Sequence, residues 1–257
     1  MSVQLQNCDY REVLEGFAVR AEADRPAMIC TDPAYRISAG GRTGQPRQMT
    51  GIFAAGQYSN DGAIVPVNMD WPEMARLFFA TLGNGGICLA MCEQRNLPVA
   101  MPAFAAAGFK FNTLWFWDKR GHGAAGPVSK FGMKTTETAM IWRRGKYLPL
   151  QPGWTGTGQI FVSPGFCKKT DHPTEKPVRL MRQFVEAWTP PGALVLDPMM
   201  GTGSTGVACA ATGRRFAGCE IDKSWFDVAR ARITAVRAGG GDRPPSDQAD
   251  FFAAAPA

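Results

Sequence analysis

Asp197-Pro198-Met199-Met200-Gly201-Thr202-Gly203-Ser204-Thr205-Gly206 is the stretch that decides the fold, because it contains a complete G-x-G-x-x-G pattern. The apolar residues 193–196 precede it and predict a buried parallel strand. The small residues 204–211 follow it and predict the start of a helix. A strand, a glycine turn and a helix in this order leave open backbone N–H groups at a helix N-terminus, where a ligand can bind.

A second strand is predicted over residues 215–219, and it is followed directly by the acidic residue Glu220. A carboxylate at this distance from the glycine turn can accept hydrogen bonds from ribose hydroxyl groups. The pair of segments therefore predicts a nucleoside-containing cofactor. The glycine pattern alone suits NAD, FAD or S-adenosylmethionine equally well, and it also occurs in tight turns that bind nothing.

An earlier segment places chemistry at the end of another strand. Residues 28–31 predict a short apolar strand, and Asp32-Pro33-Ala34-Tyr35 follows it. A carboxylate at the C-terminal end of a strand lies where open α/β sheets bind their ligands. An aromatic residue three positions later can provide a stacking face. By itself, an Asp-Pro pair is more typical of an ordinary turn.

A third segment, His172-Pro173-Thr174-Glu175-Lys176-Pro177, lies between these two. Pro177 suits the first turn of a helix, and the residues that follow keep one apolar face. The polar residues of the segment are expected at the entrance of that helix. A capped surface helix would have the same pattern.

Together the three segments resemble the β class of DNA amino-methyltransferases, in which Asp-Pro-Pro-Tyr, His-Pro-x-x-Lys-Pro and Asp-Pro-Phe-x-Gly-x-Gly follow one another in this order. The resemblance runs from about residue 5 to residue 237. Two positions depart from the family pattern: Ala34 replaces the second proline, and Met200 stands near the usual phenylalanine. Ala34 loosens the backbone after Pro33, whereas methionine keeps an apolar, polarizable side chain.

The resemblance implies one α/β domain: a Rossmann-like, doubly wound, mostly parallel seven-stranded sheet of the S-adenosylmethionine-dependent methyltransferase fold, with the catalytic half first in the chain. Residues 1–118 form the catalytic half and residues 170–238 the cofactor-binding half. Residues 119–169 form a basic segment with a small target-recognition region. Residues 239–257 are rich in glycine and proline and are expected to be disordered.

The resemblance also implies the reaction, a methyl transfer from S-adenosylmethionine to an exocyclic amino group of a base in DNA. Asp32 and the carbonyl oxygen of Pro33 would accept hydrogen bonds from the two N–H groups of the amine. Tyr35 would stack on a base that has been flipped out of the duplex. Asp rather than Ser at position 32 favours adenine N6 over cytosine N4. No metal is needed.

The cofactor roles come from the resemblance, position by position. Gly201 and Gly203 would lie along the methionine moiety, with Thr205 capping the next helix. Thr174 and Lys176, which precede the helix expected after Pro177, would lie near the methionine carboxylate. The remaining contacts would be made by Glu220 with the ribose, Ile221 and Asp9 with the adenine, and Asp197 with the ammonium group. His172 is expected to be structural.

The charge distribution indicates a polyanionic partner. The chain of 257 residues has a net charge of +6, and the segment 110–146 carries eight basic residues against two acidic ones. Such a patch binds phosphates in a salt-sensitive way, although an ordinary solvated face would have the same composition. The candidates for DNA phosphate binding are Lys119, Arg120, Lys130, Lys134, Arg143 and Arg144. The small polar surface predicts a short recognition site or loose specificity.

Seven scattered cysteines with no C-x-x-C pair argue against structural zinc and against a disulfide framework. They suit a reducing cytoplasm, in a bacterium or a phage-infected cell. Neither a signal peptide nor a membrane-spanning run is expected. Double-stranded DNA is the expected partner. A homodimer is expected from the family resemblance, and no residue pattern in the sequence predicts it.

Three alternatives remain at this point. The enzyme could act on cytosine N4 or on RNA. An NAD-dependent oxidoreductase would use the same glycine turn, but it would leave residues 32–35 and 172–177 without a role. A non-catalytic DNA-binding protein is suggested by Ala34 alone, while an intact Asp32 and Tyr35 argue against it.

Overall fold

A computed structural model describes residues 2–33, 70–119, 135–162, 170 and 175–239 of the chain. Parts of two sequence predictions lie outside these residues: residues 120–134 and 163–169 of the basic segment 119–169, and all but residue 239 of the tail 239–257. None of the helices in the described part of the chain is both long and apolar enough to cross a membrane.

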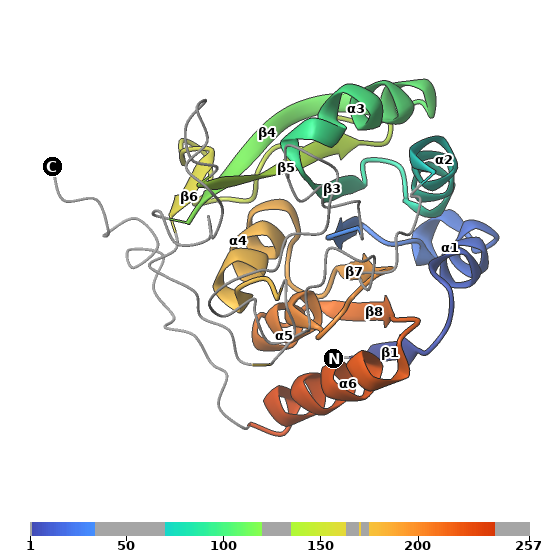
Figure 1. Cartoon of the computed structure of the whole chain (residues 1–257), viewed down its shortest axis with the longest axis vertical. Coiled ribbons are helices and arrows are strands. Elements are labelled where there is room, and N and C mark those ends of the chain that lie inside the picture. Colours follow the sequence, from blue (N-terminus) through green and yellow to red (C-terminus); the bar gives the residue numbers. More distant parts are fainter. Residues whose placement is uncertain (1, 34–69, 120–134, 163–169, 171–174, 240–257) are drawn as a thin grey trace, which may run out of the picture.

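The described residues build a sheet of eight strands in the order β1-β8-β7-β2-β3-β5-β4-β6 (Figure 1). All neighbouring strands are parallel except where β5 pairs with β3 and β4. The strands are β1 (Val3–Gln6), β2 (Met28–Thr31), β3 (Ile87–Cys92), β4 (Lys110–Asp118), β5 (Thr136–Arg143), β6 (Ile160–Val162), β7 (Leu194–Asp197) and β8 (Arg215–Cys219).

The expected mostly parallel α/β sheet is confirmed, but the expected number of seven strands is wrong. The additional strand is β6, which pairs with the end of β4. Three residues are too few to show an alternating pattern, and Ile160 is 63% exposed at the edge of the sheet. Sequence periodicity therefore had no means of detecting β6.

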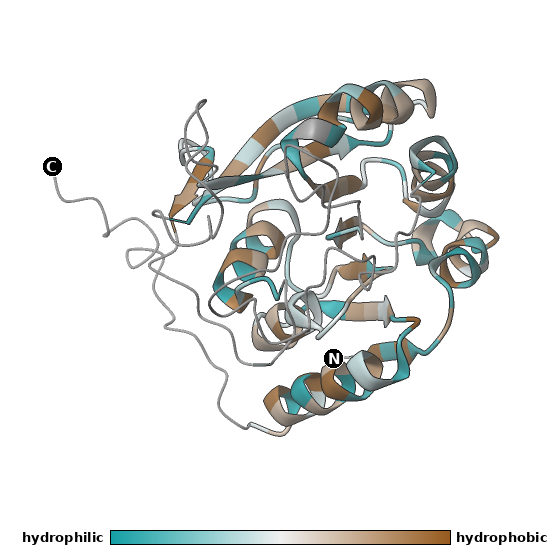
Figure 2. Cartoon of the chain, in the orientation of Figure 1, coloured by the Kyte–Doolittle hydropathy of each residue, from teal (hydrophilic) through white to brown (hydrophobic). Residues whose placement is uncertain are grey.

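The helices cover the two faces of the sheet in two groups. One face carries α1 (Tyr10–Ala18), α2 (Trp71–Thr81) and α3 (Leu97–Ala106), and the other carries α4 (Val178–Trp188), α5 (Ser204–Ala211) and α6 (Lys223–Arg237). Short 3₁₀ turns occur at Glu22–Asp24 and Gln94–Asn96. Figure 2 shows the resulting pattern, with apolar residues on the central strands and both apolar and polar residues around each helix.

Strand β2 shows why the sheet is buried from both sides. All four of its residues are buried; Met28 and Cys30 pack in the core of the α4–α6 face, while Ile29 packs in the core of the α1–α3 face. Successive side chains of a strand point to opposite faces, so a continuous apolar run is what a central parallel strand requires.

Helix α3 has a proline, Pro102, in its interior. The helix continues through Pro102 from Leu97 to Ala106. The proline leaves one carbonyl, that of Pro98 in the first turn, without its helical donor. Ala100 and Phe104 on the same helix are fully buried, and this packing keeps the helix continuous.

The topology gathers acidic residues at one edge of the sheet. Strands β2, β7 and β8 are parallel neighbours or near neighbours, and their C-terminal ends lie at the same edge. Asp32 directly follows β2, Asp197 is the last residue of β7, and Glu220 directly follows β8. This edge contains the candidate site.

Candidate active site

The glycine turn joins β7 to α5, and its backbone requires glycine. Gly201 has φ +50° and Gly203, the N-cap of α5, has φ +81°. A Cβ on Gly203 would lie 2.9 Å from Cβ of Ala229 in α6, so this glycine also allows close helix packing. No side chain caps α5, and Thr205 is its second residue; the expectation that Thr205 caps the helix is therefore wrong.

Glu220 closes the turn from the neighbouring strand. The Gly201 N–H donates to Glu220 Oε2 at 2.9 Å, and the Asp222 N–H donates to Oε1 at 2.9 Å. Burial raises the pKa of Glu220, and these backbone donors oppose the rise. Glu220, the residue predicted to bind the ribose, thus contacts the glycine turn directly, although α5 and β8 lie between the two in the sequence.

Asp197 lies deeper in the same site and is 3% exposed. Its Oδ1 accepts a hydrogen bond from the Met199 N–H at 3.3 Å. Burial raises the pKa of Asp197 to about 7, although the Thr205 hydroxyl favours the charged form. A cation placed beside this carboxylate would be favoured, because it would lower the cost of keeping the buried charge.

Asp32 and Lys176 meet across 144 residues of sequence. The Lys176 ammonium, immediately before the N-cap Pro177 of α4, pairs with Asp32 Oδ2. Asp32 Oδ1 is buried and has no hydrogen-bond partner among the described residues. Burial raises the pKa of Asp32, and the charge of Lys176 opposes the rise. The carboxylate is therefore held by one oxygen while the other is left as an acceptor.

Glu137, on β5, belongs to the same cluster, and sequence reasoning missed it. Its Oε2 lies 3.3 Å from Lys176 Nζ, and its Oε1 pairs with Lys119. Burial opposes ionisation of Glu137, but Lys176 and Lys119 outweigh it and lower the pKa of Glu137 to about 2. The available signal was a single acidic residue within the strand Thr136–Arg143.

A second buried ion pair, also missed, joins the Lys176 segment to the glycine turn. Arg232 of α6 lies 2.9 Å from Glu175 Oε1 and donates from its other terminal nitrogen to the Thr202 carbonyl at 2.8 Å. The side chain of Glu175 is 2% exposed, and its Oε2 accepts from the Thr170 N–H and hydroxyl group. Arg232 thus fixes two segments of the site to one helix.

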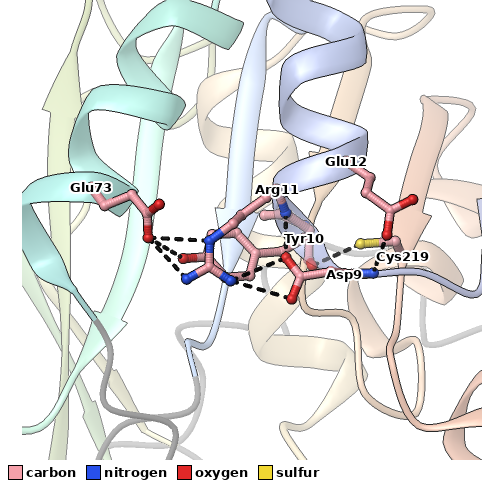
Figure 3. Close-up of polar contacts among 7 residues, drawn as sticks. Asp9, Tyr10, Arg11, Glu12, Glu73 and Cys219 are labelled. Carbon is pink, nitrogen blue, oxygen red and sulfur yellow. Dashed lines mark hydrogen bonds and ion pairs between the residues drawn. The ribbon is translucent and has the colours of Figure 1, made fainter.

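Asp9 and Ile221 lie close to the glycine turn in the fold: Asp9 follows β1, which pairs with β8, and Ile221 follows Glu220. Asp9 is the N-cap of α1: it accepts from the Arg11 N–H at 2.9 Å, and Arg11 also pairs with Glu73 of α2 (Figure 3). Ile221 is 69% exposed directly after Glu220. An apolar side chain exposed beside a ribose-binding candidate can cover the flat face of a base.

The described members of the predicted DNA-phosphate set, Lys119, Arg143 and Arg144, are not all brought together. Lys119 lies at the site and pairs with Glu137. Arg143 and Arg144 lie at the other end of β5, about 20 Å along the strand from Glu137. Arg143 contacts Asn112, and Arg144 pairs with Glu22 at 3.2 Å. The other residues predicted for the site, Tyr35, Arg120, Lys130, Lys134 and Thr174, lie outside the described residues.

The described side chains suit S-adenosylmethionine chemically. Its ammonium charge matches the buried carboxyl group of Asp197, and Glu220 is suited to ribose hydroxyl groups. Ser204 Oγ and Asp32 Oδ1 are buried polar atoms with no hydrogen-bond partner in the described part of the chain. Among the described residues, no group of three or more His, Cys, Asp or Glu side chains could hold a metal ion.

Comparison with known proteins places these observations in a family. The family model described as DNA methylase matches residues 155–231. "Putative methylase YubD" of Escherichia coli K12 is 36% identical over 87% of this chain and 90% of its own. "Type II methyltransferase M2.DpnII" of Streptococcus pneumoniae is 27% identical over 85% of this chain and 86% of its own.

Solved structures share the fold. M1.HpyAVI in complex with SAM has a TM-score of 0.66 at 22% identity, covering 90% of this chain and 99% of that one. The cytosine-N4-specific PvuII DNA methyltransferase has a TM-score of 0.67 at 15% identity, covering 93% of this chain and 92% of that one. At such identities the likeness concerns the fold.

Proposed function

The chain belongs to the DNA methylase family of N6/N4 amino-methyltransferases, and on that premise we propose that it methylates the N6 amino group of adenine in DNA. S-adenosylmethionine is the methyl donor. One observation carries the proposal: Asp32 is anchored through Oδ2 and has Oδ1 buried without a partner in the described structure.

The chemistry explains why such an oxygen is useful. The exocyclic amine of adenine is a poor nucleophile, because its lone pair is delocalised into the ring. S-adenosylmethionine supplies a methyl group that is electrophilic because it is bound to a sulfonium. Asp32 Oδ1 and the Pro33 carbonyl would accept the two N–H groups of the amine and stabilise the positive charge that develops on nitrogen. The N–C bond would form as the C–S bond breaks, the electron pair of the C–S bond would stay on sulfur, and the methylated amine would then release one proton to solvent.

The proposed cofactor contacts follow the site. Backbone groups at Gly201 and Gly203 approach the methionine moiety, and Asp197 lies beside its ammonium group. Glu220 binds the ribose hydroxyl groups. The other proposed contacts, made by Thr174, Lys176, Thr205, Ile221 and Asp9, are retained from the sequence. Asp9 caps α1 and Lys176 pairs with Asp32, so each of these two side chains would contact the cofactor in addition to its protein partner.

We further propose that the target base leaves a DNA duplex to reach Asp32, because Oδ1 is buried and a stacked base could not approach it. Residues 1–118 and 170–238 act as catalytic and cofactor halves, and residues 119–169 read a short site. The relatives named above are bacterial, which supports a bacterial cytoplasm as the place of action. A homodimer stays a prediction.

The decisive test is transfer of labelled methyl groups to unmethylated DNA, followed by nucleoside analysis, with Asp32→Ala in parallel. N6-methyladenine from the parent and none from the variant is the expected result. Asp24→Ala, on an exposed 3₁₀ turn, is the matched control and should retain activity. N4-methylcytosine as the product would refute the base assignment and keep the reaction class. Product on RNA alone would refute DNA as the substrate.

A further inference from the structure

Four charged side chains with alternating sign form a continuous chain at the site. Lys119 follows β4, Glu137 lies on β5, Lys176 precedes α4 and Asp32 follows β2. Each pairs with the next: Lys119 with Glu137 Oε1, Glu137 Oε2 with Lys176 at 3.3 Å, and Lys176 with Asp32 Oδ2. Their side chains are 8–22% exposed, so solvent screens these interactions only weakly.

The position of Lys176 within this chain of charges affects Asp32. Lys176 has a carboxylate on each side, and its position between them depends on both. If Glu137 were neutral, the Lys176 ammonium would lose the attraction that opposes its attraction to Asp32. The ammonium could then move onto Asp32 and approach Oδ1, the oxygen that is unpartnered in the described structure. A displacement of about 1 Å at a reacting group can cost a hundredfold in rate.

We propose that Glu137 is a positioning residue for methyl transfer: it holds the Lys176 ammonium on Asp32 Oδ2 and so keeps Oδ1 available to the target amine. The proposal rests on the function proposed above, because it presupposes that Asp32 accepts the amine. Glu137 lies outside all three motif segments, and it acts on the reaction through Lys176.

The same geometry fixes the electrostatic consequences. Asp32 faces the cations Lys176 and Lys119 and the anions Glu137 and Asp197. Neutralising Glu137 removes a like charge from beside Asp32, so the Asp32 carboxyl should titrate at lower pH. Neutralising Lys119 removes an opposite charge, so it should titrate at higher pH. A purely structural role would not give shifts of opposite sign.

The experiment compares the parent with Glu137→Gln, Glu137→Asp and Lys119→Gln, using full-length protein. The Asp32 carboxyl is followed by ¹³C NMR during a pH titration and assigned with Asp32→Asn. Glu137→Gln should lower its midpoint by about one pH unit, and Lys119→Gln should raise it. The kcat of Glu137→Gln should fall tenfold or more with KM for S-adenosylmethionine within about twofold, and Glu137→Asp should recover part of the loss.

Asp227→Asn, which removes a paired, 42%-exposed carboxylate from α6, controls for a general loss of charge and should behave as the parent. If Glu137→Gln folds poorly, Lys119→Gln tests the network from its other end. An unmoved Asp32 midpoint, or an unchanged kcat in Glu137→Gln, would overturn the positioning role. An active Asp32→Asn would instead refute the proposed function, while the two opposite midpoint shifts would still establish the charge network.

Discussion

Replacing Arg232 by methionine should destabilise the protein strongly, because it removes a cation from beside a buried carboxylate. The Arg232 side chain is 13% exposed and that of Glu175 is 2% exposed, with 2.9 Å between their charged atoms. Breaking a buried pair by removing one partner costs about 3–5 kcal/mol. Methionine keeps most of the side-chain volume, so the loss reports on charge and hydrogen bonding and not on a cavity.

A loss of about 3 kcal/mol is a large share of the 5–15 kcal/mol that stabilises a typical domain. For a chain of this size it should lower Tm by about 6–12 °C. Urea unfolding followed by circular dichroism would measure the free energy directly. The Kd for S-adenosylmethionine should rise as well, since Arg232 also holds the Thr202 carbonyl of the glycine turn.

Arg230→Met is the matched control, two residues away on the same helix. Its pair with Asp227 at 3.1 Å is exposed, with side chains 61% and 42% accessible. Exposed pairs of this kind contribute between 0 and about 1 kcal/mol. The double variant Arg232→Met/Glu175→Gln should recover part of the loss, because it no longer buries the glutamate charge. A loss below 1 kcal/mol in Arg232→Met, or one equal to that of Arg230→Met, would refute the reasoning.

Two further predictions concern the cofactor-binding half of the molecule, and a third, in α1, is the counterpart of the second. Burial raises the pKa of Asp197 to about 7, above its ordinary value near 3.9, so the folded state binds the extra proton and stability falls as pH rises from about 4 to 7. Asp197→Asn should therefore exceed the parent in stability at pH 8, by up to about 4 kcal/mol, with a smaller gain in urea unfolding at pH 5; equal gains at both pH values would contradict this. A Cβ on Gly206 would lie 2.4 Å from Ile233 Cδ1, so Gly206→Ala should cost about 1–3 kcal/mol. Gly16, in α1, has open space around it, so Gly16→Ala should instead stabilise the protein by about 1 kcal/mol. A lower Tm for Gly16→Ala would show that the effects of glycine substitutions do not follow packing.

Sequence patterns predicted the elements around the glycine turn closely. The strand over 215–219 is observed with those bounds, the strand expected over 193–196 is observed as Leu194–Asp197, and residues 204–211, predicted as the start of a helix, form all of α5. These predictions depend on local information: apolar runs between polar residues, and a small-residue run after a glycine turn. The mostly parallel α/β arrangement was expected from the family resemblance, and the observed sheet confirms it.

The contacts that define the site could not be predicted in the same way. Glu137, Lys176 and Asp32 come from three distant segments, and no local pattern states which lysine will lie beside which carboxylate. The basic run that contains Lys119 and Arg143 appeared as one patch in the sequence. Lys119 and Arg143 lie at opposite ends of the paired strands β4 and β5, about 25 Å apart along the strands, and only the strand pairing reveals this.

The pairing of β1 with β8 has a consequence for how the protein is made. Val3 lies opposite Phe216, so the first of the described strands pairs with the last of them. At about 5–20 residues per second, the intervening chain takes roughly 10–40 s to be synthesised. During that time β1 has no native neighbour among the described strands, and β2 lacks its partner β7. We therefore expect the described sheet to assemble only after β8 has been synthesised.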